Sequence, residues 1–368
     1  MTHADPTNRR ADPADHADPA ATADRPVRPT DADRTDGATH TGGADRTTDA
    51  DRSAGVPRPD GSAVPGAGGP TTTFAGQVAA VGPDPVRAGR YRVDVDPGWI
   101  CPTVPQGGLM AALAARAMTL ELGDPALALR SLTTVFAAPV PAGPVTVDVE
   151  VHRRGRSMAQ VTATTRPAGG GPGHILVAVF GRSRPGFALT DRVPPEVPSP
   201  GDCPSFDDPA PDGTVEPPVP FWQLVEGRPA LGHAPWDPSP RHRSDCAYWY
   251  RFREPPCRTD GTYDPLALVT LCDTMPGTIG ERVGGEPLDW WGPSADLTVH
   301  VLGEARGEWL LGHVRAGRAG DGYASADIDL WDAAGDLVAH GTQVMFFTFP
   351  GGAPDPALLV PADQRAPG

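Results

Sequence analysis

Residues 105–122 read PQGGLMAALAARAMTLEL and have the composition of a helix that is buried on most of its sides. Pro105 to Gly108 punctuate its start, and about four turns of small and apolar residues follow without a helix breaker. Apolar residues nearly surround this helix, which is typical of a helix covered by other elements. The many alanines would let a sheet approach closely. We therefore predict a buried helix packed against β-structure.

The chain on both sides of this helix has the patterns of β-strands. The segment TVDVEV at 146–151 alternates polar and apolar residues, as a half-buried antiparallel strand does. A glycine-rich turn at 169–173 separates the last two strands of this block. The predicted strands are FAGQVAAV (74–81) and RYRVDVDPGW (90–99) before the helix, and SLTTVFAAPV (131–140), GPVTVDVEVHRRG (143–155), SMAQVTATTR (157–166) and HILVAVFGRSRPG (174–186) after it.

A second block of the same kind follows. It begins with FWQLVEG (221–227) and the aromatic strand SDCAYWYRFREPP (244–256), and a helix is predicted over DPLALVTLCDTMPGTIGERV (264–283). Asp264 is placed to cap this helix, Pro265 suits its first position, and Pro276 should kink or end it. A hairpin turn at 332–335 joins the last two strands. The strands predicted after the helix are ADLTVHVL (295–302), GEWLLGHVRAGRA (307–319), YASADIDLW (323–331) and DLVAHGTQVMFF (336–347).

The two blocks share one plan of entry strands, one helix and four further strands. Leu132 matches Leu297, and Ser157 matches Gly322, in both cases at a separation of 165 residues (297 − 132 and 322 − 157). After the third strand we expect the separation to drop to about 161, because the first block has the longer turn. The repeat predicts an α+β chain built from two copies of one helix-and-sheet unit. Two unrelated α+β sheets are the alternative.

The rest of the chain reads as tails and a linker. Residues 1–72 consist almost wholly of Ala, Asp, Thr, Arg, Pro and Gly, and they cannot bury enough apolar surface to offset the entropy of ordering them. A proline- and aspartate-rich stretch at 188–219 is expected to pack along the surface. We therefore predict a disordered tail at 1–72, a first unit at 73–187, a linker at 188–219, a second unit at 220–350 and a C-terminal tail at 351–368.

Composition argues against several classes of protein. The net charge is −15 and every basic residue is arginine, which argues against general nucleic-acid binding. No window approaches the roughly 20 apolar residues needed to cross a membrane, and the N-terminal region lacks the apolar core of a signal peptide. The five cysteines include no C-x-x-C pair, so neither a disulfide framework nor a zinc knuckle is expected. A reducing cytoplasm is the simplest location.

The motifs of several kinds of catalysis are missing as well. The sequence has no G-x-S-x-G nucleophile motif, no G-x-x-x-x-G-K-[ST] phosphate loop and no Rossmann glycine fingerprint after a strand. The ten histidines make no H-x-x-x-H or H-E-x-x-H cluster. We therefore expect neither a metal nor a cofactor.

Several segments together resemble the acyl-CoA thioesterase II-like family. They are PQGGLMAAL, SLTTVFAAPVPAGPVTVDVEVHRRGRS, LCDTM, DLTVHVL and AHGTQ, and their order and spacing carry the resemblance over residues 73–349. The family has a double hotdog fold, which is two fused copies of a long helix wrapped by a curved antiparallel β-sheet. The resemblance implies an acyl-CoA or related acyl-thioester substrate. It also implies a homo-oligomer, since such proteins associate further through sheet edges.

The resemblance implies a group of catalytic residues. In this family an Asp on the second helix, a hydroxyl residue before the next strand and a Gln late in the last strand hold and activate a water that attacks the thioester carbonyl. These positions are Asp273, Ser294 and Gln343 here. Ser294 stands where the family pattern has Thr, and Thr298 is the alternative hydroxyl if the alignment is shifted.

The residues themselves are compatible with these roles. Asp273 interrupts an apolar helix segment, and a carboxylate there must be paired, capped or functional, because burying an unpaired charge is costly. A partly desolvated Asp beside an amide and a hydroxyl suits a general base for one water. The amide of Gln343 could orient that water or stabilise the developing oxyanion. The structural alternatives are that Asp273 caps a neighbouring loop and that Gln343 is an ordinary edge-strand amide.

Other residues have candidate binding roles. Gly107 and Gly108 open the first helix, where backbone N–H groups can point at a thioester oxygen; alternatively they only allow close packing. Arg156 belongs to an arginine group that could contact the phosphates of coenzyme A or could form a solvated face. The other members of that group are Arg153, Arg154, Arg182 and Arg184.

Two rivals to hydrolysis remain. One is a non-catalytic hotdog protein that binds an acyl thioester or another apolar ligand. The other is an enoyl-thioester hydratase or dehydratase, which normally pairs an Asp with a His. Asp273 has no His at a suitable spacing, which counts against the second rival.

Overall fold

The computed structural model describes residues 72–209, 219–234, 237, 243–283, 289–360 and 364. All of them belong to the compact unit Pro57–Gly368, which is the unit described below. The tail predicted at 1–72 lies outside the described residues except for Thr72. Residues 210–218 of the predicted linker also lie outside them.

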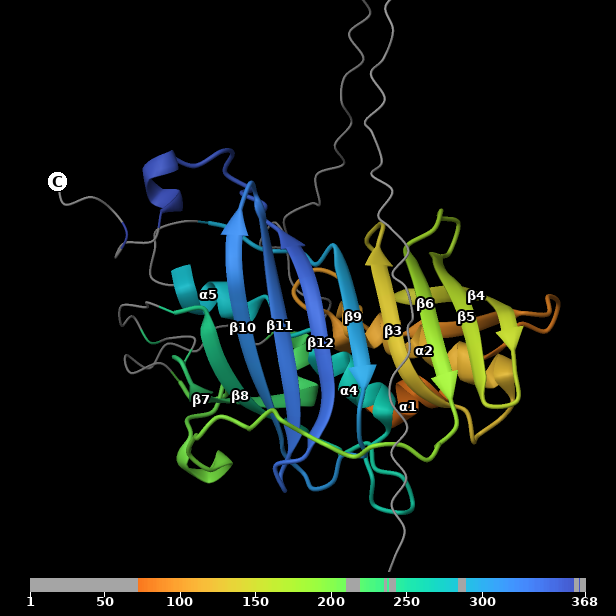
Figure 1. The fold of residues 1–368 in the computed structure, drawn as a ribbon. Helices are drawn as coiled ribbons and strands as arrows, with labels where there is room; N and C mark the ends of the chain where they lie inside the picture. The colour runs from red at the N-terminus through yellow and green to blue at the C-terminus, as the bar shows by residue number, and fades with distance from the viewer. Residues whose placement is uncertain are drawn as a thin grey trace, which may run out of the picture. The chain divides into compact units, whose positions relative to one another are not determined.

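The described strands form one 12-stranded antiparallel sheet, shown in Figure 1. Their order is β1-β2-β4-β5-β6-β3-β9-β12-β11-β10-β8-β7, so the two halves of the sheet are arranged alike about the central β3–β9 pair. The first half contains β1 (Gly82–Pro83), β2 (Arg90–Val95), β3 (Ala128–Phe136), β4 (Gly143–Arg154), β5 (Met158–Pro167) and β6 (His174–Gly181). The second half contains β7 (Val225–Leu231), β8 (Asp245–Phe252), β9 (Asp296–Val301), β10 (Leu310–Gly320), β11 (Tyr323–Asp332) and β12 (Leu337–Phe346).

The two copies meet where β3 pairs with β9, and Thr133 lies opposite Thr298 at this junction. The two threonine hydroxyl oxygens are 3.0 Å apart, and the residues are separated by the 165 positions predicted for the repeat. Thr133 also pairs with Val177, and Thr298 pairs with Thr342. The last strands, β6 and β12, are therefore related by the same separation of 165 (342 − 177).

The predicted drop of this separation to about 161 is wrong. The last two strands pair in the same register in both copies, since Met158 lies opposite Gly181 and Tyr323 lies opposite Phe346, each 165 residues on; β12 simply begins two residues earlier in the repeat than β6. Both copies even carry a register shift at the same place, between Val151 and Arg153 and between Ala316 and Arg318. The α+β architecture of two like units, predicted as a double hotdog, is confirmed.

Helix α2, Gly107–Leu122, is the predicted buried helix of the first copy. Its side chains from Gly108 to Ala115 are all buried, and it packs on β3, β4, β5 and β6. The helix ends where Gly123 takes a left-handed conformation with φ 57°, which glycine adopts without strain. In Figure 1 this helix and the helices of the second copy lie behind the strands, on one face of the sheet.

The second copy has two shorter helices, α4 (Pro265–Cys272) and α5 (Gly277–Val283). Asp264 caps α4 as predicted, since its carboxylate accepts a hydrogen bond from the Leu266 N–H at 2.9 Å. The predicted break at Pro276 is also confirmed, because this residue lies between the two helices. Helix α4 packs against β9, β11 and β12, so it occupies the place in the second copy that α2 occupies in the first.

The strand predicted at 74–81 is wrong, because Phe74–Ala79 form helix α1. Thr73 caps this helix by accepting a hydrogen bond from the Gly76 N–H, and Phe74 and Val78 lie one turn apart, both buried in the core. Of the strand predicted at 90–99, only β2 is extended. The remaining short elements are the 3-10 turns η1 (Pro97–Trp99), η2 (Pro200–Asp202) and η3 (Pro356–Leu359) and helix α3 (Pro220–Leu224).

Residues 188–200 of the predicted linker run over the face of the second half of the sheet that is opposite to the helices (Figure 1), and Phe206 then packs on the main core beside Trp222. Val197 packs there against an apolar cluster that includes Trp331, and the Trp249 indole N–H donates to the Pro198 carbonyl oxygen at 2.9 Å. Arg192 forms an ion pair with Asp329, which is buried in β11. The linker is thus held by both apolar and charged contacts.

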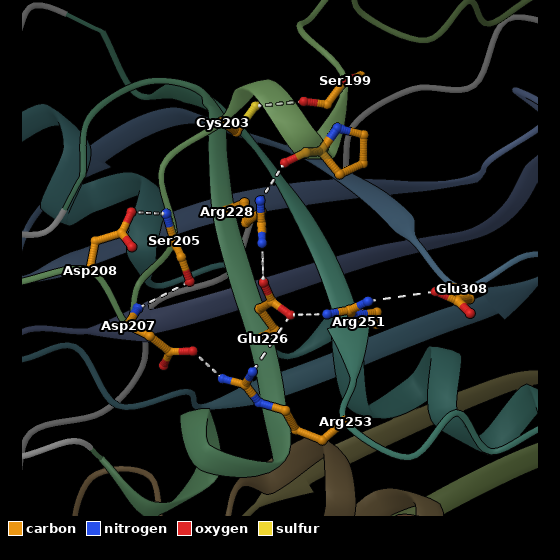
Figure 2. A network of polar contacts seen from close by, with 11 residues as sticks. Ser199, Cys203, Ser205, Asp207, Asp208, Glu226, Arg228, Arg251, Arg253 and Glu308 are labelled. Atoms are coloured by element: carbon orange, nitrogen blue, oxygen red, sulfur yellow. Dashed lines mark hydrogen bonds and ion pairs between the residues drawn. The ribbon is translucent and has the colours of Figure 1, made fainter.

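A network of ion pairs also holds the linker at the edge of the sheet, where Glu226 on β7 binds several arginines (Figure 2). Glu226 is buried, and its carboxylate accepts hydrogen bonds from Arg228 at 2.7 Å and from Arg251 at 2.6 Å. Arg228 also donates to the carbonyl oxygen of Pro200 in the linker at 2.8 Å. The charges in this network neutralise one another, which suits a structural contact.

Arg192→Ala should loosen the linker without unfolding the sheet. Asp329 keeps Arg315 and His340 as partners, so we expect a loss of about 1 to 3 kcal/mol from the linker contact and not the larger cost of leaving a buried carboxylate unpaired. The rate of chymotrypsin cleavage between residues 186 and 198 should rise several-fold. Arg306→Ala is the control, because its partner Glu304 is exposed. Equal cleavage of the two variants would contradict the role of Arg192.

Candidate active site

Asp273 lies at the end of α4, where the helical backbone breaks. It is the C-cap of this helix, with φ −89° and ψ 37°, and it follows an unbroken run of buried residues from Leu266 to Cys272. The helix itself is buried, whereas Asp273 is only partly buried, so its carboxylate lies where the core meets solvent. Such a group needs hydrogen-bond donors from other elements.

Separate parts of the chain bring donors to this carboxylate. Gln343 on β12 donates from Nε2 to Oδ1 at 2.6 Å, and the Ser294 hydroxyl, just before β9, donates to the same oxygen at 3.3 Å. The Gly108 N–H, in the first turn of α2, donates to Oδ2 at 2.7 Å. Gln343 also donates to the Ser294 hydroxyl oxygen. The structure thus brings Asp273, Ser294 and Gln343 into one hydrogen-bonded cluster.

The alternation of side chains along β12 places Gln343 toward the helices. Gly341 and Met345 share this face with it, and all three are buried. Gly341 lets α4 come close, since a β-carbon there would lie 3.2 Å from the Cβ of Cys272. Met345 forms an isolated β-bridge with Ser294, which fixes the serine beside the glutamine.

Burial raises the pKa of the Asp273 carboxyl to about 6, from an ordinary value of 3.8. The hydrogen bonds from Gln343, Gly108, Ser294 and Gly107 act in the opposite direction, because they stabilise the charged form. A carboxyl group with this pKa is ionised at neutral pH and still basic enough to accept a proton. Those are the properties of a general base.

The two glycines at the start of α2 are packed against Asp273. A β-carbon at Gly108 would lie 2.7 Å from the Cβ of Asp273 and 2.8 Å from the carbonyl oxygen of Val269. A β-carbon at Gly107 would lie 2.8 Å from Oδ2 of Asp273 and equally close to the ring of Phe136. Glycine at both positions lets α2 and α4 approach, and the N–H groups of both glycines serve the carboxylate.

Gln106 is a site residue that the sequence did not reveal. It is the N-cap of α2, and its Oε1 accepts a hydrogen bond from the Leu109 N–H at 2.7 Å. Its Nε2 donates to the carbonyl oxygens of Thr270 at 3.0 Å and Asp273 at 3.1 Å. The signal in the sequence was a polar residue directly before the paired glycines, but its partners are more than 160 positions away.

Thr298, the alternative hydroxyl, is not brought to Asp273. Its neighbours Leu297 and Val299 are the residues of β9 that are fully buried, so its own side chain lies on the other face of the sheet. There its hydroxyl is bonded to that of Thr133.

Arg156 also lies away from the cluster. It is exposed in the turn between β4 and β5, and its carbonyl oxygen accepts a hydrogen bond from Arg182, which forms an ion pair with Asp124. Asp124 follows the C-terminal end of α2, roughly 20 Å along the helix axis from Gly108. A contact between Arg156 and a coenzyme A phosphate stays a prediction.

Within the part of the chain that the structure describes, one group of side chains has the spacing of a metal site. Asp327, Asp329 and His340 have ligand atoms within 4.8 Å of one another. Arg315 donates to both carboxylates, and Arg192 pairs with Asp329. These guanidinium groups already supply the positive charge that the carboxylates need, so we assign no metal to this group.

Comparisons with known proteins place the chain in a family. The family model for the acyl-CoA thioesterase N-terminal domain matches residues 95–181, and the one for the acyl-CoA thioesterase C-terminal domain matches residues 200–347. The chain belongs to the acyl-CoA thioesterase family. Its two thioesterase domains correspond to the two halves of the sheet. The comparison with curated proteins found no match for this chain.

Solved structures share its fold. A conserved protein of unknown function with a hot dog fold from Alicyclobacillus acidocaldarius is 26% identical, with a TM-score of 0.63, over 76% of this chain and 99% of that one. An acyl-CoA thioesterase II, TesB2, from Mycobacterium marinum is 22% identical, with a TM-score of 0.57, over 76% of this chain and 100% of that one. A tesB protein from Mycobacterium avium subs paratuberculosis is 18% identical, with a TM-score of 0.58, over 75% and 100%.

A membrane-spanning helix was not expected from the sequence. None of the helices in the described ranges is long and apolar enough to cross a membrane.

Gly108→Ala should push α2 away from Asp273. The new methyl group would lie within 3 Å of the Asp273 Cβ and of backbone carbonyl oxygens, so the helices must shift. We expect a loss of about 1 to 3 kcal/mol in the free energy of unfolding, measured by denaturant titration. Gly280→Ala on α5 is the control, since a β-carbon there meets no atom within 4 Å and alanine favours helix. Equal stability of Gly108→Ala and wild type would show that the packing is not tight.

Proposed function

We propose that this protein hydrolyses acyl-CoA thioesters, with Asp273 as the general base for the attacking water. The observation that supports this is a partly buried carboxylate of raised pKa, which accepts hydrogen bonds from the Gln343 amide and the Ser294 hydroxyl. Family membership supports the substrate class. A cytoplasmic location and a homo-oligomer stay predictions.

In the proposed reaction, a water beside Asp273 gives one proton to the carboxylate while its oxygen bonds to the thioester carbonyl carbon. The carbonyl electrons move onto the carbonyl oxygen, and a tetrahedral intermediate forms. When it collapses, the C–S bond breaks and the sulfur leaves with the electron pair of that bond. The sulfur takes the proton from Asp273, so the products are a carboxylic acid and a free thiol, and the carboxylate is restored.

Gln343 has an acceptor atom left for this water. Its Nε2 is used by Asp273 and Ser294, whereas its Oε1 is buried and has no hydrogen-bond partner among the residues described. Buried acceptors without a partner are uncommon because they cost desolvation energy. A water between this Oε1 and Asp273 would donate one proton to each, which leaves its lone pair for the carbonyl carbon.

The start of α2 can stabilise the negative charge that develops on the thioester carbonyl oxygen. The N-terminal end of a helix carries partial positive charge, and the N–H groups of Gly107 and Gly108 are exposed to the same small region as Asp273. Once Asp273 has taken the proton, its oxygens accept hydrogen bonds less strongly. A glycine N–H is then available to donate a hydrogen bond to an oxyanion that lies beside the carboxyl group.

Dehydratase chemistry has less support. The carboxylate of Asp273 accepts hydrogen bonds from Gln343, Ser294 and the glycine amides, and no histidine is among these partners in the described ranges. A protein that only binds acyl thioesters is distinguished from a hydrolase by measuring acyl-CoA binding and thiol release on the same sample.

Asp273→Asn should abolish thiol release while leaving acyl-CoA binding in place, because the amide cannot take a proton from water. We expect kcat to fall by about 100-fold or more, measured by thiol release across acyl chain lengths, with binding followed by calorimetry. Asp264→Asn, on the same helix, keeps a good N-cap and should hydrolyse like wild type. If Asp273→Asn is as fast as wild type, the base is misassigned. If wild type binds acyl-CoA but releases no thiol, the protein is a binding protein.

The pH dependence of kcat/KM should report the Asp273 carboxyl. Its pKa is raised to about 6, so the base becomes protonated and inactive as the pH falls through that value. We expect kcat/KM to fall about tenfold per pH unit below it and to level off above about pH 7. A profile that is flat down to about pH 4.5 would mean that another group, or none, acts as the base.

A further inference from the structure

At the break between α4 and α5, the side chain of Gln106 donates hydrogen bonds to backbone carbonyl oxygens at the end of α4. The last carbonyl groups of a helix have no N–H partner within the helix. Gln106 is 4% exposed, and its amide donates to the carbonyl oxygen of Asp273 and to that of Thr270, which also accepts the Asp273 N–H at 3.2 Å. Its own backbone is fixed by a hydrogen bond from its N–H to the Trp99 carbonyl oxygen at 2.9 Å.

The same side chain starts α2. Its Oε1 accepts the hydrogen bond from the Leu109 N–H, as an N-cap does. One amide group therefore joins the end of the helix that carries Asp273 to the start of the helix that carries Gly107 and Gly108. The two helices belong to different copies of the repeat, so this join sets how the copies meet at the site.

We propose that Gln106 is a positioning residue that holds the Asp273 carboxylate against the amides of Gly107 and Gly108. This inference rests on the proposed role of Asp273 as the base. It also predicts an ionisation property of Asp273 that can be measured without any substrate.

The chemistry of the position requires glutamine. It needs an acceptor for the start of α2, a donor for the carbonyls of α4, and a side chain long enough to reach both. Serine and asparagine are shorter, and glutamate would lack the donor and place a second negative charge near Asp273. The repeat does not require a polar residue at position 106, because the equivalent position in the other copy, 165 residues on, is Leu271 (271 − 106 = 165).

The pKa of Asp273 depends on burial and on its hydrogen-bond donors, and not on other charged groups among the residues described around it. Cys101, in the loop before α2, and Cys272, on α4, are ionisable groups that the charge of Asp273 affects. Burial raises the pKa of both thiols, that of Cys101 to about 12, so both are neutral at the pH of the experiment. The facing groups on the other elements, Gln343 on β12 and Ser294, do not ionise. Loosening the glycine amides should therefore raise the pKa of Asp273 further.

The test is Gln106→Met, which keeps the length and removes both kinds of hydrogen bond. The titration of Asp273 is followed by infrared spectroscopy, with the protonated carboxyl band assigned from its loss in Asp273→Asn. We expect the midpoint to rise by roughly one pH unit. In the proposed reaction, kcat should fall about 10- to 100-fold with a smaller change in KM, and the pH profile should move by the same amount.

Gln77→Met is the matched control. Gln77 is equally buried and also bridges elements, donating to the Asp94 carbonyl oxygen at 2.9 Å and accepting from the Asp96 N–H at 3.0 Å. It should lose stability like Gln106→Met without moving the midpoint. Gln106→Asn keeps an N-capping amide without adding charge but is too short to reach α4, so it decides the matter if the methionine variant does not fold; it should also raise the midpoint.

Unmoved midpoints in the Gln106 variants, or an equal shift in Gln77→Met, would overturn the proposal. If the wild type titrates as expected and Gln106→Met moves the midpoint, but no thioester is cleaved, the positioning role stands and the proposed function fails. The two ideas are therefore separable in one set of proteins.

Discussion

A carboxylate partly withdrawn from water needs hydrogen-bond donors from the protein, and at Asp273 those donors come from both halves of the chain. Gln343 and Ser294 belong to the second copy, whereas Gly108 belongs to the first. Neither copy alone can satisfy the group. The junction between β3 and β9 thus does more than extend the sheet, because it holds the two helices at the separation that this carboxylate requires.

The same junction explains why, among the residues described, this cluster forms in one copy of the repeat and not in the other. The separation of 165 that relates Thr133 to Thr298 also relates Gly108 to Asp273, and these two residues touch. A carboxylate at 108 would have its β-carbon 2.7 Å from that of Asp273, which leaves no room and would set two like charges against each other. Ala178 stands at the place equivalent to Gln343 (343 − 178 = 165), so the polar set is present in one copy only. The repeat therefore sets the positions of the helices and strands, whereas the polar cluster consists of residues that differ between the two copies.

The sequence was sufficient for features that depend on local pattern. Periodicity and capping residues located α2, the break at Pro276 and the long strands, and the family pattern named Asp273, Ser294 and Gln343. Features that depend on partners distant in sequence were not accessible. Helix α1 has only six residues, too few to show a helical period, so the apolar segment FAGQVAAV predicts a strand that tertiary packing overrides. The raised pKa of Asp273 and the role of Gln106 depend on contacts across the two copies, which no local window contains.

The interruption of the helix is what makes the cluster chemically useful. In a continuous helix the carbonyl oxygens near Asp273 would bond to N–H groups of the next turn, and the side chain would project from a regular surface. Pro276 prevents this, so the backbone at Asp273 leaves helical geometry: the Thr270 carbonyl keeps only the Asp273 N–H at 3.2 Å, and the Asp273 carbonyl needs a donor from elsewhere. Gln106 provides hydrogen bonds to both from the opposite copy, at the residue that also begins α2. The cost of breaking one helix is thereby offset by the contact that brings the amides of the other helix to the carboxylate.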